Sequence, residues 1–456
     1  MPSSKPDNPE QVSVIEPQEA VAAQAPPAPP PAEAAPMNRW WVVLGAVLIQ
    51  FCLGAIYAWN IFATQLVAGY GYTGRQTQLI FGVGLAAFSI LMILTGRVIG
   101  RFTPRQIALT GGLVLGLGYV LGSFVVESFP LLLLSIGLIG GAGIGIAYVI
   151  PIAVGVKWFP DRKGLLTGLA VAGFGFGAMV WINLAGSWAG LLERLGVGGV
   201  FFWYGIAFAL LVLLGSLWMV DPPAGYRPAG WTPPQPAAGK AAPVELGPVG
   251  MLRTWQFYLI WMLFMSGSLA GLMVIGCIGL FAEATLESVG LDALAVAATV
   301  SLVWGVFGSI GNGVGRIAWG MISDGIGRRL AVSLMFLIQG IVLLAFYPMG
   351  FSPWLLYLGA ALIGFNFGGT LALFPAVTAD VFGSKNVGRN YGWVFTAYGF
   401  GGIVGPYLGG LFGDLGQSAG DLRAWLIPFL VAALLCLAAA AGTWMLKPPV
   451  SATQEG

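Results

Sequence analysis

The chain has 456 residues, of which 57% are hydrophobic and only 8% are charged, whereas a soluble globular domain carries about a quarter charged residues. This composition excludes a soluble globule and indicates a polytopic membrane protein. The net charge of +2 and the lack of a basic cluster exclude nucleic acid as a partner. There is no histidine, and Cys52, Cys277 and Cys436 stand in apolar runs without CxxC spacing, so we expect no metal site, cofactor or disulfide framework.

The N-terminal segment is rich in proline and alanine, and Lys5 is the only base before Arg39. Such a composition cannot bury a hydrophobic core, so we expect a disordered tail over 1–38. The segment also lacks the basic start and apolar middle of a signal peptide. The first apolar run is therefore expected to remain in the protein as a helix.

From Trp40 onward, twelve apolar runs of membrane-spanning length alternate with short charged connections. The runs fall at about 40–68, 76–96, 106–126, 130–156, 163–189, 197–220, 254–282, 293–321, 329–349, 353–379, 388–413 and 422–446. This pattern predicts an all-α membrane protein with twelve transmembrane helices.

One connection, 221–253, is much longer than the others and is rich in Pro, Gly and Ala. We interpret it as a cytoplasmic linker between two pseudo-symmetric halves of six helices, 39–220 and 254–447, followed by a short cytoplasmic tail over 448–456. An internal repeat supports this division. The segment GMISDGIGRR, which ends at Arg329, follows GRVIGRFTPR by 224 residues, and the same offset relates Pro375 to Pro151.

The basic residues predict how the chain crosses the membrane. If both termini and the even-numbered connections are cytoplasmic, 16 Lys and Arg residues face the cytoplasm and only Arg75, Arg194 and Arg423 face outside. Such an excess is the positive-inside bias of membrane proteins. We therefore expect a multi-pass protein of the cell (inner) membrane, surrounded by lipid, with both termini cytoplasmic.

Arg316 is the one charged residue between Asp292 and Asp324. Counting back from Asp324 at about 1.5 Å per residue places Arg316 roughly 12 Å inside the membrane. A guanidinium at that depth costs about 3 kcal/mol or more, so we expect it to face a polar cavity and to hold an anion. Its planar fork of donors suits a carboxylate. The alternative is that Arg316 pairs with a helix carbonyl or extends toward the cytoplasmic surface.

The connection after the eighth run carries a superfamily motif. It matches the loop signature G-x-x-x-D-x-x-G-R-R of the major facilitator superfamily at every fixed position, namely Gly320, Asp324, Gly327, Arg328 and Arg329. The N-terminal copy is degraded, with Gly100 at the acidic position and Pro104 at the first basic one. The resemblance implies a gating role for this motif, and a substrate site near the midplane between the two halves.

A finer resemblance is to the oxalate/formate antiporter family and the related monocarboxylate transporters. It rests on GAIYAWNIF in the first run, GIAYVIPIAVGVKWFPDRKGLLTGLAVAGFGFG across the fourth and fifth, Arg316 in the eighth, and RNYGWVFTAYGFGGIVGP in the eleventh. It extends from Asn38 to about Lys447. In these families an Arg at the position of Arg316 binds the substrate carboxylate.

Two differences from these families bear on the charge of the substrate and on how transport is coupled to a second ion. Oxalate transporters add a Lys in the eleventh helix, where this chain has Tyr398 and no base between Arg389 and Arg423. One cation in a low-dielectric cavity favours a monocarboxylate over a dianion. Animal-type monocarboxylate transporters carry an Asp where this chain has Asn312, which shares a helix face with Arg316 but cannot carry a proton. Proton symport and anion exchange therefore both stay open.

The resemblance also implies that Tyr148 faces the substrate, and Tyr57 and Tyr398 occupy helices that line the cavity of this fold. Each could instead be a packed aromatic side chain. Asn183, Asn366 and Cys277 are weaker candidates, because single small polar residues often serve as hydrogen-bond partners between helices.

These observations predict a secondary active transporter of small monocarboxylates such as lactate, pyruvate or formate. It is expected to work as a monomer by alternating access, with no catalytic residues. The alternative within the same class is an oxalate:formate antiporter. A membrane enzyme is disfavoured because the membrane runs contain no catalytic acids, His or metal ligands, and a sensor because no soluble output domain is evident.

Overall fold

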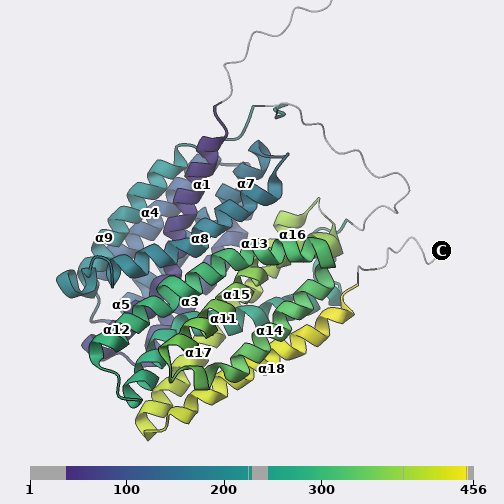
Figure 1. Ribbon diagram of the computed structural model, residues 1–456. Coiled ribbons are helices and arrows are strands. Elements are labelled where there is room, and N and C mark those ends of the chain that lie inside the picture. The colour runs from purple at the N-terminus through teal and green to yellow at the C-terminus, as the bar shows by residue number, and fades with distance from the viewer. Residues whose placement is uncertain (1–36, 224, 229–244, 384, 448, 450–456) are drawn as a thin grey trace, which may run out of the picture. The chain divides into compact units, whose positions relative to one another are not determined.

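The computed structural model describes residues 37–223, 225–228, 245–383, 385–447 and 449. In this part of the chain the structure consists of helices and their connections, and contains no β-strand (Figure 1). The tail predicted over 1–38 lies outside the described residues except for Met37 and Asn38, and so do most of the 448–456 tail and residues 229–244 of the linker. The described residues from Asn38 onward belong to one compact unit.

The six predicted spans before the linker are all helical. They are α1–η1–α2 (Trp40–Leu53, Gly54–Ala58, Trp59–Tyr70), α3 (Gly74–Val98), α4 (Pro104–Ser123), α5–η2–α6–α7 (Phe129–Leu132, Leu133–Gly140, Gly141–Ala147, Val149–Trp158), α8 (Lys163–Ala185) and α9 (Leu191–Ser216). We call this group, α1 to α9, the N-terminal set.

The six predicted spans after the linker are helical as well. They are α11 (Trp255–Ser288), α12–η3–α13 (Ala293–Leu302, Val303–Gly308, Ser309–Ile326), α14 (Arg328–Met349), α15 (Pro353–Phe382), α16–α17 (Val387–Val394, Thr396–Ala419) and η4–α18–η5 (Leu422–Trp425, Leu426–Gly442, Thr443–Met445). We call this group, α11 to η5, the C-terminal set. A short helix, α10 (Pro248–Leu252), lies within the predicted linker.

Ten helical segments of the described chain are long and apolar enough to cross a membrane. Each coincides with one of the twelve predicted spans. The other two spans are α8, in which the fully described apolar part is Val171–Ala185, and α16–α17, which is interrupted at Phe395 and whose glycines dilute its apolar residues.

Two helices of the C-terminal set, α11 and α17, continue six residues past their predicted ends at 282 and 413. The apolar run marks the hydrocarbon layer, but a helix continues into the polar layer until the backbone turns away. In both cases a glycine in the left-handed region follows, at Gly290 (φ +81°) and Gly420 (φ +64°), as is common at helix C-termini. Acidic side chains beyond the apolar run are consequently held on helices.

The two sets meet along α3 and α17 with little side-chain volume between them. A Cβ atom on Gly82 of α3 would stand 2.9 Å from the carbonyl oxygen of Gly402 on α17. Small residues let membrane helices approach this closely. We call this contact the α3–α17 seam.

A second close approach positions the residues around Arg316. A Cβ atom on Gly54 of η1 would lie 2.0 Å from the backbone oxygen of Phe174 on α8. Gly54→Ala should therefore push η1 from α8 and lower the apparent melting temperature by about 3 °C or more, as overpacking costs about 1–3 kcal/mol. Thermal unfolding of the purified protein measures this. Gly69→Ala is the matched control, because nothing lies within 4 Å of a Cβ there, and equal melting of the two variants would contradict the expectation.

Candidate functional site

Arg316 lies in α13, and only 3% of its surface is exposed. Its Nε donates a hydrogen bond to Oδ1 of Asn312 at 3.1 Å. The two residues are one helical turn apart, so the bond follows directly from the helical repeat. The bond fixes the direction of the guanidinium plane and leaves its two terminal nitrogens pointing away from Asn312.

These terminal nitrogens, Nη1 and Nη2, have no hydrogen-bond partner among the described residues, and neither does Nδ2 of Asn312. Arg316 also forms no ion pair with a described acid. Leaving a buried charged donor unsatisfied is costly, so a group that accepts from both nitrogens stabilises the site. A carboxylate has the matching geometry, because its two oxygens accept the two parallel N–H bonds of an arginine.

The three predicted tyrosines lie around Arg316, each at or near an interruption of its helix. Tyr57 is in the 3₁₀ segment η1, Tyr148 separates α6 from α7, and Tyr398 follows the break between α16 and α17 at Phe395. The hydroxyls of Tyr57 and Tyr398 are hydrogen-bonded to each other at 2.9 Å, which joins the two sets of helices. The hydroxyls of Tyr57 and Tyr148 both lie close enough to Arg316 for an electrostatic interaction, but neither meets the geometry of a hydrogen bond to Nη1 or Nη2.

Phe174 of α8 lies at the centre of this group and is a residue that the sequence analysis missed. The Arg316 guanidinium carbon lies 5.7 Å from the centroid of its ring, within the range of a cation–π interaction. The same ring makes edge contacts with Tyr57 at 5.1 Å and Tyr148 at 5.5 Å between centroids. The glycines that flank Phe174 in the sequence GFGFG could have indicated its role, because glycines permit close helix contacts on both sides of the ring.

Asn366, on α15, lies beside α13 rather than free in a cavity. Its Oδ1 accepts a hydrogen bond from Nε1 of Trp319 at 3.2 Å, and its Nδ2 has no partner among the described residues. The close packing of α15 on α13 brings Gly368 to the backbone of Arg316. Asn366 therefore supports the helix that carries the arginine.

The structure places Asn183 and Cys277 in contacts between helices. Nδ2 of Asn183 donates to the backbone oxygen of Gly305 in η3 at 3.0 Å. The Cys277 thiol lies 3.5 Å from the carbonyl oxygen of Pro406, at the α11–α17 contact. Neither is among the residues that contact Arg316.

The superfamily motif forms the turn between α13 and α14. Gly327 has a φ of +89° there, a conformation that side-chain-bearing residues rarely adopt. Arg328 pairs with Asp324 at 2.9 Å and with Asp380 of α15 at 3.5 Å. These ion pairs connect α13, α14 and α15 at the end of the bundle nearest Lys447.

The other two motif positions differ in their contacts. Arg329 donates a hydrogen bond to the backbone oxygen of Leu446, which ties α14 to the last helix of the chain. Nothing lies within 4 Å of a Cβ built on Gly320. All five motif residues therefore lie within the C-terminal set.

A polytopic helical bundle whose two sets of helices meet around a buried, unpaired arginine defines a membrane transporter. The family model of the Major Facilitator Superfamily matches residues 42–314 and 297–456, so the chain belongs to this superfamily of multi-pass membrane transporters, whose members are not enzymes. The predicted fold and superfamily are thus confirmed.

Relatives agree with this assignment, and a solved structure agrees with the fold. The chain is 28% identical over 402 residues to the oxalate:formate antiporter of Oxalobacter formigenes, covering 87% of this chain and 88% of the relative. It is 26% identical over 387 residues to monocarboxylate transporter 13 of Bos taurus, with 83% and 84% covered. The crystal structure of a bacterial homologue of the human lysosomal transporter Spinster matches with a TM-score of 0.65 at 17% identity, covering 89% of this chain and 96% of that one.

Proposed function

We propose that this protein is a secondary active transporter of small monocarboxylates of the lactate, pyruvate and formate type, and that Arg316 binds the substrate carboxylate. The observation that carries the proposal is the pair of terminal nitrogens on a 97%-buried arginine that have no partner among the described residues. A substrate carboxylate would supply both missing acceptors and would neutralise the charge.

The single cation favours a monoanion. Tyr398 stands where oxalate transporters of the resembling family carry a Lys, and it offers a hydroxyl in place of a charge. A dianion bound to Arg316 alone would retain one uncompensated negative charge in a low-dielectric cavity. The aromatic rings of Tyr57, Tyr148 and Phe174 suit the apolar remainder of a small organic acid.

The mechanism we propose is rocking of two six-helix halves, 39–220 and 254–447, joined by the linker at 221–253. A bound anion neutralises Arg316 and so lowers the cost of enclosing it away from water, which lets the loaded carrier cross more readily than the empty one. The motif from Gly320 to Arg329 would stabilise one arrangement of the C-terminal half. The charge asymmetry of the connections supports an inner-membrane protein with both termini in the cytoplasm.

Oxalate:formate exchange is the second candidate, and the similarity to the Oxalobacter antiporter favours it. Counterflow separates the two. Proteoliposomes loaded with unlabelled formate would accumulate labelled oxalate only if the site accepts a dianion.

The direct test is uptake of labelled L-lactate into proteoliposomes, with and without an inward proton gradient and with and without trapped unlabelled acid. Stimulation by the proton gradient alone would indicate symport, and uptake only against a trapped anion would indicate exchange. An absence of uptake under every condition would overturn the monocarboxylate proposal.

Asn312 offers a test of coupling. In Asn312→Asp, the new carboxylate would lie one turn from Arg316 and pair with it, so a substrate could displace it only after protonation. We expect the ratio of lactate uptake at pH 5.5 to that at pH 7.5 to rise about fivefold or more over the wild-type ratio. Initial rates in proteoliposomes measure it. Asn312→Ser removes the amide without adding an acid and should keep the wild-type pH profile; an unchanged profile in both variants would refute the expectation.

A further inference from the structure

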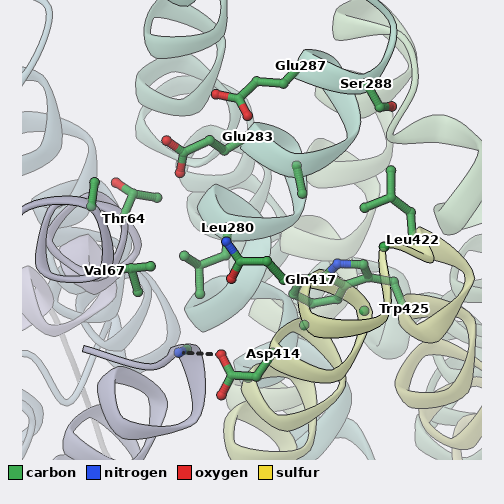
Figure 2. A pocket seen from close by; sticks show the side chains of 17 residues that line it. Thr64, Val67, Leu280, Glu283, Glu287, Ser288, Asp414, Gln417, Leu422 and Trp425 are labelled. Carbon is green, nitrogen blue, oxygen red and sulfur yellow. Dashed lines mark hydrogen bonds between the residues drawn. The ribbon is translucent and has the colours of Figure 1, made fainter. Parts of the chain in front are cut away.

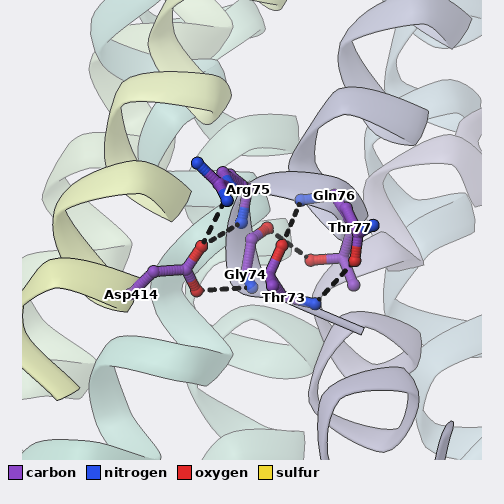
Figure 3. Close-up of polar contacts among 6 residues, drawn as sticks. All are labelled: Thr73, Gly74, Arg75, Gln76, Thr77 and Asp414. Atoms are coloured by element: carbon purple, nitrogen blue, oxygen red, sulfur yellow. Dashed lines mark hydrogen bonds and ion pairs between the residues drawn. The ribbon is translucent and has the colours of Figure 1, made fainter. Parts of the chain in front are cut away.

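Asp414 of α17 contacts the first residues of α3, on the opposite set of helices (Figure 3). Its Oδ1 accepts a hydrogen bond from the backbone N–H of Gly74 at 2.6 Å, and its Oδ2 accepts one from the N–H of Arg75 at 3.0 Å. The Arg75 Nε lies 4.0 Å from the same carboxylate. Among the described residues this is the only ion pair between the N-terminal and the C-terminal set.

The start of α3 explains why this carboxylate fits. The first N–H groups of a helix have no partner within the helix. Thr73 and Gln76 form a capping box, in which the Thr73 hydroxyl accepts from the Gln76 N–H at 3.2 Å and the Gln76 amide oxygen accepts from the Thr73 N–H at 2.9 Å. The capping box leaves the backbone N–H groups of Gly74 and Arg75 without a partner in α3. These are the two groups that donate to Asp414. The cap of α3 is complete only while α17 lies against it.

Close backbone approach holds the carboxylate at this distance. A Cβ atom on Gly410, one turn before Asp414, would stand 2.7 Å from the backbone oxygen of Gly74. A Cβ on Gly74 would stand 2.7 Å from the Asp414 Oδ1 itself. Both glycines are needed for the contact, which is the end of the α3–α17 seam.

Asp414 also lines a cavity of about 710 Å³ beside the seam (Figure 2). The cavity lies between α2 of the N-terminal set and α11, α17 and the start of the last span, and it is further lined by Glu283 and Glu287 of α11. The Asp414 side chain is 23% exposed. Water in this cavity can solvate the carboxylate and the two N–H groups as they separate, so the contact can break and re-form.

We propose that Asp414 is a conformational latch, which holds α3 and α17 together while the transporter is closed at this end and releases them when the Arg316 site opens toward it. Asp414 does not contact the substrate site; it is a positioning residue that acts through the two helices. The latch does not depend on which acid the protein transports.

The test measures opening at this end with a thiol reporter. Asn60 of α2 is fully buried, its backbone oxygen would stand 3.0 Å from a Cβ on Gly279 of α11, and its side-chain amide has no hydrogen-bond partner among the described residues. Asn60→Cys therefore places a buried thiol on α2, near its contact with α11, without removing a hydrogen bond. Its alkylation rate by a soluble maleimide, in full-length protein in lipid nanodiscs, follows opening. Protein without the reporter corrects for the three buried native cysteines.

Asp414→Asn keeps the shape but loses the charge and one of the two acceptors. We expect it to raise the alkylation rate about tenfold, which is the effect of losing a hydrogen bond to a charged group. Asp421→Asn is the matched control, since the Asp421 carboxylate also caps a helix, by accepting from the Arg423 N–H at 2.9 Å, but does so within the C-terminal set. Thr73→Ala frays the α3 cap without removing the contact between sets.

An unchanged rate in Asp414→Asn, or an equal rise in Asp421→Asn or Thr73→Ala, would overturn the proposal. Should Asp414→Asn not fold, Gly410→Ala provides the second variant. Its methyl group would displace α17 from Gly74 and should raise the alkylation rate in the same direction. An unchanged rate there would equally overturn the latch.

Discussion

Arg316→Gln should reduce carboxylate uptake by about 100-fold or more. Removing one member of a desolvated, hydrogen-bonded charge pair costs about 3–5 kcal/mol, and the neutral amide cannot replace the fork of two charged N–H donors. Arg316→Lys keeps the charge but loses the fork, so we expect an intermediate loss of about tenfold. Initial uptake rates in proteoliposomes, normalised to the amount of folded protein, measure both.

The loss should come without unfolding. Arg316→Gln removes a buried charge whose terminal nitrogens have no partner among the described residues, so the melting temperature of the empty protein should stay the same or rise. Added lactate should stabilise the wild type but not this variant. Arg101→Gln, at an exposed position of a connection, is the control. Full uptake by Arg316→Gln would refute the proposal that Arg316 binds the substrate carboxylate.

Tyr398→Lys should change the preferred charge of the substrate. A second cation near Arg316 would offset the second carboxylate of a dianion, so the ratio of oxalate uptake to lactate uptake should rise about tenfold or more. Without oxalate, two cations would be buried close together, and the melting temperature should fall. Oxalate should restore it, which gives a readout independent of transport.

Tyr398→Phe distinguishes charge from packing. It keeps the ring, which stacks on Phe395 at 4.7 Å between centroids, and removes only the hydroxyl that bonds to Tyr57. This variant should not gain oxalate uptake. If Tyr398→Lys folds yet binds oxalate no better than Tyr398→Phe does, position 398 does not set the charge preference.

The helices could be predicted from the sequence because apolar runs report directly on burial in lipid. Their ends could not, since the end of a helix depends on a local turn such as that at Gly420 and not on hydropathy. Arg316 and Asn312 could also be paired from spacing alone, because residues four apart share a helix face.

The rest of the candidate site depends on contacts between distant segments. Phe174 belongs to an apolar run in which every residue is a reasonable packing residue, and its place beneath Arg316 follows only from the approach of α8 to α13. Asp414 and Gly74 are 340 residues apart, and the acid stands just past a predicted helix end, where a solvated side chain is the ordinary expectation. Sequence periodicity contains no information about either contact.

The α3–α17 seam bears on how fast such a protein can change shape. Side chains that interdigitate must leave one set of rotamers and enter another before two surfaces part, and each such step adds to the activation barrier. Where Gly82 faces the backbone of Gly402, there are no rotamers to exchange. At this point the two helices can separate and rejoin without repacking, so parting there requires only that water reach the exposed backbone and no exchange of rotamers.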